Sequence, residues 1–194
     1  MSNIITVPIP PDTRKKIISD SEARGRLNNG TLVNGEGNIG GFAGEAIVQL
    51  YLPFLKPSSN LKKELYNFDF KLPNGKKIDV KSKGNCKFAP EVNYDCTVPA
   101  DQRHQQTDFY VFTRISRDLD VGWICGVISK KRFYEIASLR KEGEAYNNNG
   151  RKSVHDHYCC LIKDLDSITN VSINNHGVYL GHCYGCPDQC GATF

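Results

Sequence analysis

Apolar and polar residues alternate along residues 65–72 and 76–83, which a short Pro-Asn-Gly break separates. An alternation with a period of two is typical of β-strands, so the pattern predicts a β-hairpin. A three-residue loop with Gly75 in the left-handed conformation places Asp69 opposite Asp79, whereas a two-residue turn mixes apolar and polar residues on each face. We therefore expect one apolar face and one face that carries both aspartates.

Two segments in the first third of the chain have helical features. Apolar residues over 42–52 recur with the 3.6-residue helical period and predict a helix with one buried face. Glu45 lies about 60° from Phe42 on that helix, so its carboxylate flanks the buried face instead of pointing away from it. Residues 12–27 predict a polar, basic helix, and residues 28–41, with five glycines and four asparagines, predict a mobile loop.

The second half of the chain contains the most apolar strand candidates. Residues 108–115 and 121–128 are rich in β-branched and aromatic side chains and predict two central strands. Ser129 has the position of an N-cap for a helix over residues 130–140, and a last strand is predicted over residues 156–162. This order of elements predicts an α/β fold with a central mixed β-sheet flanked by helices.

The composition narrows the class of protein. Of the 194 residues, 39% are hydrophobic and 24% charged, which favours one globular domain over a disordered chain. No apolar run approaches the roughly 18 residues of a membrane span, and residues 1–16 lack the apolar core of a signal peptide. Eight cysteines are about 4% of the chain, below the roughly 8–10% of a disulfide scaffold. We therefore expect a reducing, intracellular and cytoplasmic location, with the cysteines as thiols or metal ligands.

The predicted hairpin gathers charged side chains that suit a divalent cation. Asp79 and Lys81 share a face with Asp69, because residues two apart on a strand point the same way. Like charges this close disfavour each other's ionised form, so the carboxylates need a neutralising partner. Carboxylate oxygens suit Mg²⁺ or Mn²⁺, which keep open positions for water and for phosphate oxygens. The alternative is an ordinary solvated hairpin face, with an Asp79–Lys81 ion pair worth a few tenths of a kcal/mol.

These residues resemble the PD-(D/E)xK, or restriction-endonuclease-like, nuclease superfamily. The matching features are a glutamate on a helix, a strand aspartate and an Asp-x-Lys strand, which are Glu45, Asp69, Asp79 and Lys81. The likeness covers about residues 40–140, and it departs from the family pattern at Phe68, where the family has proline. The resemblance implies that the three acids hold one or two Mg²⁺ ions. It also implies that the lysine positions or activates the water that attacks a phosphodiester bond.

Other residues are candidates for contacts with the substrate. Two groups of basic residues suit a phosphate backbone, one in the first predicted helix and one after the Asp-x-Lys strand: Arg14, Lys15, Lys16, Lys83 and Lys87. The net charge of +4 permits an anionic partner without requiring one. Several nucleases of the resembling superfamily place a glutamine or lysine after the Asp-x-Lys strand, which makes Gln105 or Gln106 a candidate near the metal. The alternative for these glutamines is the exposed start of a helix.

A second group of potential metal ligands lies near the C-terminus. Cys183, Cys186 and Cys190 follow a C-x2-C-x3-C spacing. Three thiols this close in sequence can gather one Zn²⁺ in a reducing compartment. Tetrahedral zinc needs a fourth ligand, which Cys159 or Cys160 on the last predicted strand could supply. An iron–sulfur cluster and free thiols are the alternatives.

Together these features predict a metal-dependent nuclease that hydrolyses phosphodiester bonds of DNA with a Mg²⁺-activated water. Residues 1–40 form the predicted basic helix and loop, 41–165 the predicted catalytic core and 166–194 a Cys-rich, zinc-binding tail. The alternative from another functional class is a non-catalytic, zinc-containing nucleic-acid-binding protein. The sequence leaves open DNA versus RNA, cleavage from an end or within the strand, and the oligomeric state, a homodimer included.

Overall fold

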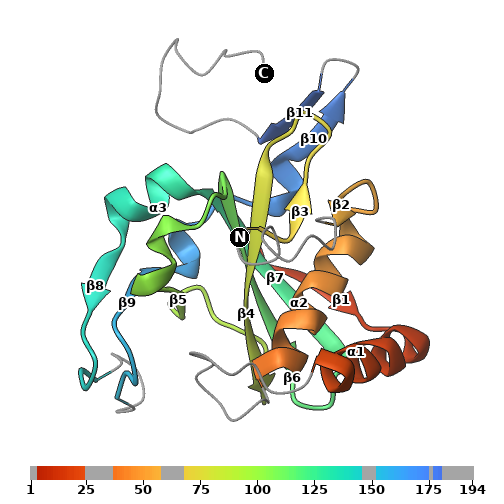
Figure 1. Cartoon of the computed structure of the whole chain (residues 1–194), viewed down its shortest axis with the longest axis horizontal. Coiled ribbons are helices and arrows are strands. Elements are labelled where there is room, and N and C mark those ends of the chain that lie inside the picture. The colour runs from red at the N-terminus through yellow and green to blue at the C-terminus, as the bar shows by residue number, and fades with distance from the viewer. Residues whose placement is uncertain (1–3, 25–36, 58–67, 146–151, 175–176, 181–194) are drawn as a thin grey trace.

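A six-stranded mixed β-sheet forms the centre of the molecule, in the strand order β1-β7-β6-β4-β3-β2 (Figure 1). The computed structural model describes residues 4–24, 37–57, 68–145, 152–174 and 177–180. β4 and β6 run parallel, and the other neighbouring strands of this sheet run antiparallel. The strands are β1 (Ile5–Pro8), β2 (Lys56–Pro57), β3 (Phe70–Lys71), β4 (Lys77–Cys86), β6 (Phe109–Ser116) and β7 (Val121–Ser129).

Two helices, α1 (Pro11–Arg24) and α2 (Gly37–Tyr51), lie on one side of the central sheet (Figure 1). α2 packs on β4 through an apolar core in which Ile47, Ile78 and Val111 are buried. Removing these side chains from water supplies the main free energy that holds the helix on the sheet. Along β4 the residues of the apolar face therefore point toward α2, and Asp79 and Lys81 point to the opposite side.

The opposite side of the sheet carries α3 (Lys130–Ile136) and a separate three-stranded sheet in the order β5-β9-β8 (Figure 1). A second core, with the aromatic side chains of Tyr110, Phe112 and Phe133, joins these elements to the central sheet. The remaining elements are β5 (Asp95–Pro99), η1 (Ala100–His104), β8 (Ser138–Arg140), β9 (His157–Leu161), η2 (Ile162–Asp164), η3 (Ile168–Asn170), β10 (Val171–Asn174) and β11 (Gly177–Leu180). The molecule thus has the mixed α/β architecture that the sequence predicts. None of the helices in the described residues is long and apolar enough to cross a membrane.

α2 approaches the sheet closely at two glycines. A Cβ atom added at Gly44 would lie 2.6 Å from the Thr113 hydroxyl oxygen and 2.7 Å from the side chain of Ser82. At Gly40 an added Cβ would lie 3.2 Å from the backbone nitrogen of Gly84. The helix therefore rests almost directly on the backbone of β4, with Glu45 next to the tighter contact.

Several predicted elements are confirmed with their local details. The hairpin has the predicted register, since Phe70 lies opposite Ile78 and Gly75 has a φ of +85°. The predicted central strands are β6 and β7, and the predicted last strand is β9. The Ser129 side chain caps α3 by accepting a hydrogen bond from the Arg132 N–H at 3.2 Å.

Two predictions of element boundaries are wrong. Residues 37–41, predicted as part of a mobile loop, form the start of α2, and Gly40 permits the close packing of this turn on β4. The helix predicted over residues 130–140 ends at Ile136, and Ser138–Arg140 pairs with β9 as β8. Backbone pairing with a neighbouring strand here outweighs the local helical preference. The first part of the predicted strand over residues 65–72 lies outside the described residues.

Candidate active site

The β3–β4 hairpin places the two predicted site aspartates side by side. The Asp69 N–H donates to the Ile78 carbonyl oxygen at 2.8 Å, which continues the ladder one residue beyond β3. The Asp69 carboxylate accepts a hydrogen bond from the Val80 N–H at 2.7 Å. This bond fixes the carboxylate beside the backbone of Asp79 and therefore fixes its position relative to the Asp-x-Lys strand.

Asp69 is in an unfavourable environment for a charged carboxylate. Burial raises its pKa well above the ordinary 3.8, and the neighbouring charges of Asp79 and Glu45 raise it further. The Val80 hydrogen bond and the charge of Lys81 act in the opposite direction but are weaker. Glu45 on α2 is thus close enough to influence Asp69, as its place at the edge of the buried helix face predicts. The three acids form one electrostatically coupled group.

Lys81 is held in place by three acceptors on the sheet face opposite α2. Its ammonium forms an ion pair with Asp79, and it donates to the side-chain oxygens of Gln102 at 2.6 Å and Gln105 at 3.0 Å. The side chains of Asp79 and Lys81 are only 8% and 12% exposed. An ion pair this buried is not the solvated hairpin face that the sequence alone leaves open. Lys81 also lies over the ring of Tyr110, 5.7 Å from its centroid.

The parallel pairing of β4 and β6 explains why the glutamines reach Lys81. Parallel strands need a crossover that returns to the starting end of the first strand. β4 ends at Cys86 and β6 begins at Phe109, opposite Ile78, so residues 87–108 run back along the sheet. η1 lies late in this crossover and therefore next to the first half of β4. Of the two glutamines predicted as candidates, Gln105 is buried and accepts from Lys81, whereas Gln106 is exposed.

Gln102 is a site residue that the sequence analysis did not single out. Its segment has no strong periodicity, so the pattern contains no direct signal for its orientation. The signal that could have found it is topological, because a crossover between parallel strands must pass the face of the strand that it leaves.

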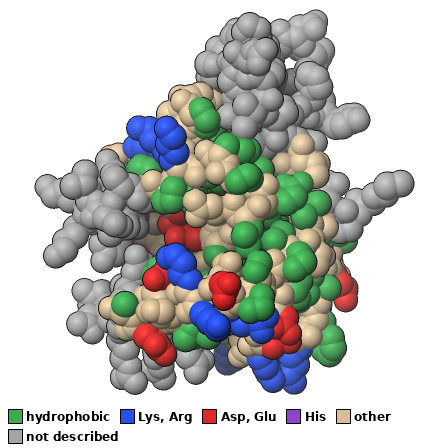
Figure 2. Space-filling view, turned by 90° about the vertical axis from the view of Figure 1, so that its right-hand side faces the viewer, with side chains coloured by type: hydrophobic (Ala, Val, Ile, Leu, Met, Phe, Trp, Pro, Cys, Tyr) green, Lys and Arg blue, Asp and Glu red, His purple; other side chains and the backbone are tan. Residues whose placement is uncertain are grey.

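The predicted basic contacts of the first helix lie away from this site. Arg14 forms an ion pair with Asp120, in the turn that joins β6 to β7 at the far end of the sheet. Asp79 lies opposite Tyr110 near the other end of β6, which a rise of about 3.3 Å per residue places about 20 Å away. Lys15 and Lys16 pair with acids of α1 at 3.8 and 2.8 Å. Figure 2, which looks onto the side that carries α1, accordingly shows positive and negative side chains interspersed along its lower part.

The remaining predicted basic contacts also lie beyond the acids. Lys83 is exposed in the second half of β4, and Lys87 is exposed directly after that strand. Lys83 and Lys87 follow Asp79 by four and eight residues along and beyond β4. The structure therefore places neither lysine beside Asp79.

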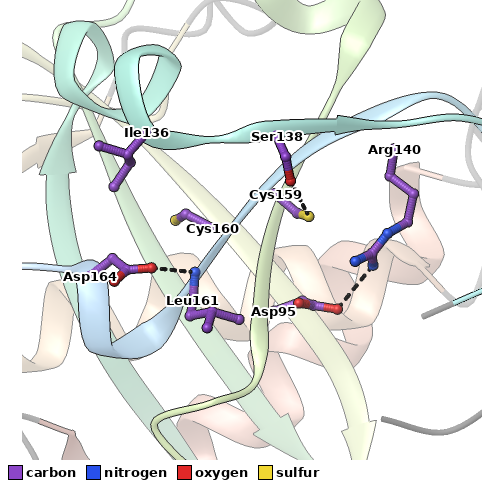
Figure 3. Close-up of a pocket in the computed structure, with 8 residues that line it drawn as sticks. All are labelled: Asp95, Ile136, Ser138, Arg140, Cys159, Cys160, Leu161 and Asp164. Carbon is purple, nitrogen blue, oxygen red and sulfur yellow. Dashed lines mark hydrogen bonds and ion pairs between the residues drawn. The ribbon is translucent and has the colours of Figure 1, made fainter. Parts of the chain in front are cut away.

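The predicted zinc ligands are only partly described. Cys159 lies in β9, is buried, and contacts the Ser138 hydroxyl at 3.7 Å. It lines an open pocket of about 250 Å³ in which Arg140 pairs with Asp95 at 3.0 Å (Figure 3). The other pocket residues are Ile136, Ser138, Cys160, Leu161 and Asp164, so none of the three coupled acids lines it. Cys183, Cys186 and Cys190 lie outside the described residues.

No group of three or more His, Cys, Asp or Glu side chains within the described part of the chain is arranged to hold a metal ion. The chemistry of Glu45, Asp69 and Asp79 nevertheless suits Mg²⁺, which is often bound by one or two carboxylates together with water and substrate oxygens. A bound cation would also relieve the mutual repulsion that raises the pKa of Asp69. The donor types therefore fit such an ion, with Asp69 and Asp79 as the nearest pair.

Comparisons of the chain with protein-family models, with curated proteins and with solved structures found no match.

Proposed function

We propose that this protein is a metal-dependent nuclease with a restriction-endonuclease-like fold that hydrolyses phosphodiester bonds of DNA. The observation that carries the proposal is the buried Asp79–Lys81 ion pair, which Gln102 and Gln105 hold next to Asp69. Burying charged groups is costly, and breaking such a pair is more costly still. Perturbed, buried charges held in one arrangement are typical of sites that do chemistry.

Each side chain has a distinct role in the proposed reaction. Asp69 and Asp79 would hold Mg²⁺ or Mn²⁺, and Glu45 would add negative charge from α2. The cation, when bound, would act as a Lewis acid toward a phosphate oxygen and a water. Lys81 would orient the attacking water or balance the charge that develops on the phosphate, because its ammonium is restrained by three acceptors.

Gln102 and Gln105 are positioning residues in this proposal. Their side-chain oxygens accept hydrogen bonds from the Lys81 ammonium and, as neutral amides, add no second negative charge beside Asp79. They therefore orient the lysine without changing the charge of the site. The zinc-binding tail and the cytoplasmic location stay predictions beside this proposal.

The decisive experiment is incubation of the purified full chain with circular and linear DNA in Mg²⁺, Mn²⁺ and EDTA. We expect cleavage with either metal and none in EDTA, and we expect Asp79→Asn to abolish most of it. Asp20→Asn, which changes an acid of α1, is the matched control and should cut like the wild type. Binding without cleavage in all three conditions would contradict the proposal and support the non-catalytic alternative.

A further inference from the structure

An arginine–tyrosine cluster lies beside the candidate active site, on the same side of the central sheet as Lys81. The guanidinium of Arg103 lies 5.2 Å from the ring centroid of Tyr134 and 5.6 Å from that of Tyr158. It also donates to the Tyr158 hydroxyl at 3.0 Å. The two rings meet edge to face, with centroids 5.0 Å apart. Three separate elements, η1, α3 and β9, thus hold one exposed arginine in a fixed orientation.

This arginine–tyrosine cluster is connected to the site through neighbouring contacts. Arg103 follows Gln102, whose side chain accepts from Lys81 at 2.6 Å. The Tyr134 hydroxyl lies 3.4 Å from that of Tyr110, which is the strand partner of Asp79. Through Gln102 and through Tyr134, the Arg103 guanidinium is therefore connected to the buried Asp79–Lys81 ion pair.

Lys130, at the start of α3, adds a second cation to this region. Its ammonium contacts the backbone carbonyl oxygen of Gln105, whose side chain holds Lys81. Burial lowers the pKa of Lys130, the charge of Asp79 raises it, and the charges of Arg103 and Lys81 lower it further. Lys130 is therefore within the electrostatic reach of both other cations.

The pairing of these cations differs from that of the basic residues on α1. In the described part of the chain, no carboxylate forms an ion pair with Arg103 or Lys130, whereas Arg14, Lys15 and Lys16 each have an acidic partner. Two neighbouring cations without a carboxylate in direct contact repel each other, and an anion that binds between them would relieve that repulsion. A planar guanidinium that is already oriented is well suited to two hydrogen bonds to one phosphate.

We propose that Arg103 and Lys130 bind phosphates of a nucleic-acid strand next to the bond that is cleaved, with Tyr134 and Tyr158 as positioning residues for Arg103. The inference rests on the proposed function in that it takes Asp79 and Lys81 as the cleavage site. Its ligand class is the phosphodiester backbone. Because backbone contacts carry no direct base information, this surface supplies affinity and register but no sequence preference.

The test measures binding of the full-length protein to a fluorescent single strand and to a duplex of the same sequence, in EDTA, between 50 and 200 mM salt (about the range in which phosphate contacts are resolved). Arg103→Ala should raise Kd about tenfold and reduce the slope of log K against log salt by about 0.7–0.9. Arg103→Lys keeps the charge but not the planar fork, so it should restore the slope and only part of the affinity. Tyr158→Phe should weaken binding by about twofold to threefold without changing the slope, because it removes the hydroxyl that orients the guanidinium.

Two matched controls separate a site effect from a general charge effect. Arg117→Ala removes an exposed arginine from the β6–β7 turn, and Lys131→Ala removes the lysine next to Lys130 on α3. Both should bind like the wild type. Three outcomes would overturn the proposal. Arg103→Ala could have the same Kd and slope as the wild type, the controls could lose as much affinity as Arg103→Ala, or the wild type could fail to bind.

The result is distinguishable from failure of the proposed function. If no metal supports cleavage but Arg103→Ala still weakens binding, the phosphate site stands and the nuclease activity does not. If cleavage is normal and binding of Arg103→Ala is unchanged, the nuclease activity stands and the phosphate site does not. Should Arg103→Ala fold poorly, Arg103→Lys and Tyr158→Phe give the same decision through their affinities.

Discussion

Two groups of polar side chains are buried on the same side of the central sheet. One contains charged side chains that are paired, and the other contains neutral thiols. Asp79 is buried in an ion pair with Lys81, whose ammonium also donates to two glutamines. The thiols of Cys96, Cys125 and Cys160 lie in the second core, where Cys96 is directly opposite Cys160 on β5 and β9. Burial raises the pKa of Cys96, and it raises that of Cys125 to about 12, so both thiols stay neutral.

The difference separates a structural cluster from a chemical one. A buried thiol behaves as a small apolar group and needs little compensation. A buried charge costs several kcal/mol unless it is paired, so retaining one demands a reason beyond stability. We infer that the thiol cluster serves packing and that the carboxylate–lysine group serves chemistry, and the following predictions test that division.

The largest expected effect is on stability at the charged group. Lys81→Ala should lower the free energy of unfolding in EDTA by about 3–5 kcal/mol, because it leaves the buried Asp79 carboxylate without its partner. The double variant Asp79→Asn with Lys81→Met should recover most of that loss, since no buried charge remains. Urea unfolding measures the free energy of unfolding of both variants. If the double variant is as unstable as Lys81→Ala, the unpaired charge of Asp79 is not the cause of the loss.

The next effect is on activity. Asp79→Asn should lower DNA cleavage in Mg²⁺ by at least about 10²-fold, because it removes a proposed metal ligand that would act in the transition state. Cys125→Ala, a change in the thiol cluster, should lower stability but leave the rate within about twofold at a temperature where it is folded. Initial rates on a linear duplex give the comparison. Equal losses in the two variants would erase the distinction between the regions.

The packing of α2 gives a smaller effect. Gly44→Ala should destabilise the protein by about 1–3 kcal/mol, because its Cβ would overlap Ser82 and Thr113. Gly41→Ala is the matched control on the same helix, since a Cβ there meets nothing within 4 Å. It should be neutral or stabilising by up to about 1 kcal/mol. Thermal unfolding of both variants checks this, and an unchanged melting temperature for Gly44→Ala would mean that the helix can move away from β4.

The last effect is a pH dependence that belongs to the thiol cluster. The pKa of Cys125 is about 12 in the folded protein and near 9.0 when exposed. The unfolded chain therefore releases this proton first, so stability falls as the pH rises above about 9, by at most about 1.4 kcal/mol per pH unit. The difference in unfolding free energy between wild type and Cys125→Ala should shrink correspondingly between about pH 9 and 11. A constant difference over that range would show that the thiol is not buried as a neutral group.

The parts of the structure that could be predicted are those in which the local pattern of residues is compatible with only one local structure. The alternation around Asp69 and Asp79 permits a single hairpin register, and Ser129 before a helical segment fixes a helix start. In contrast, the first turn of α2 contains glycines that suggest a loop. Its helical form depends on the space next to Gly84 that Gly40 occupies, which only the folded structure reveals.

The candidate site shows the same division. Asp69, Asp79, Lys81 and Glu45 could be found because the spacing within strands and helices sets which face each occupies. Gln102, Arg103 and Lys130 could not, because they reach the site through a crossover and through the packing of α3. Such long-range placements have no local periodicity in the sequence.

The contact between α2 and β4 has a consequence for how this chain can change over time. Because Gly44 rests on the Ser82 side chain, a larger residue at position 44 is tolerated only if position 82 loses volume, whereas Gly40 faces the backbone of Gly84, which has no side chain to lose. We expect position 40 to stay small and positions 44 and 82 to change together in diverged copies of the protein.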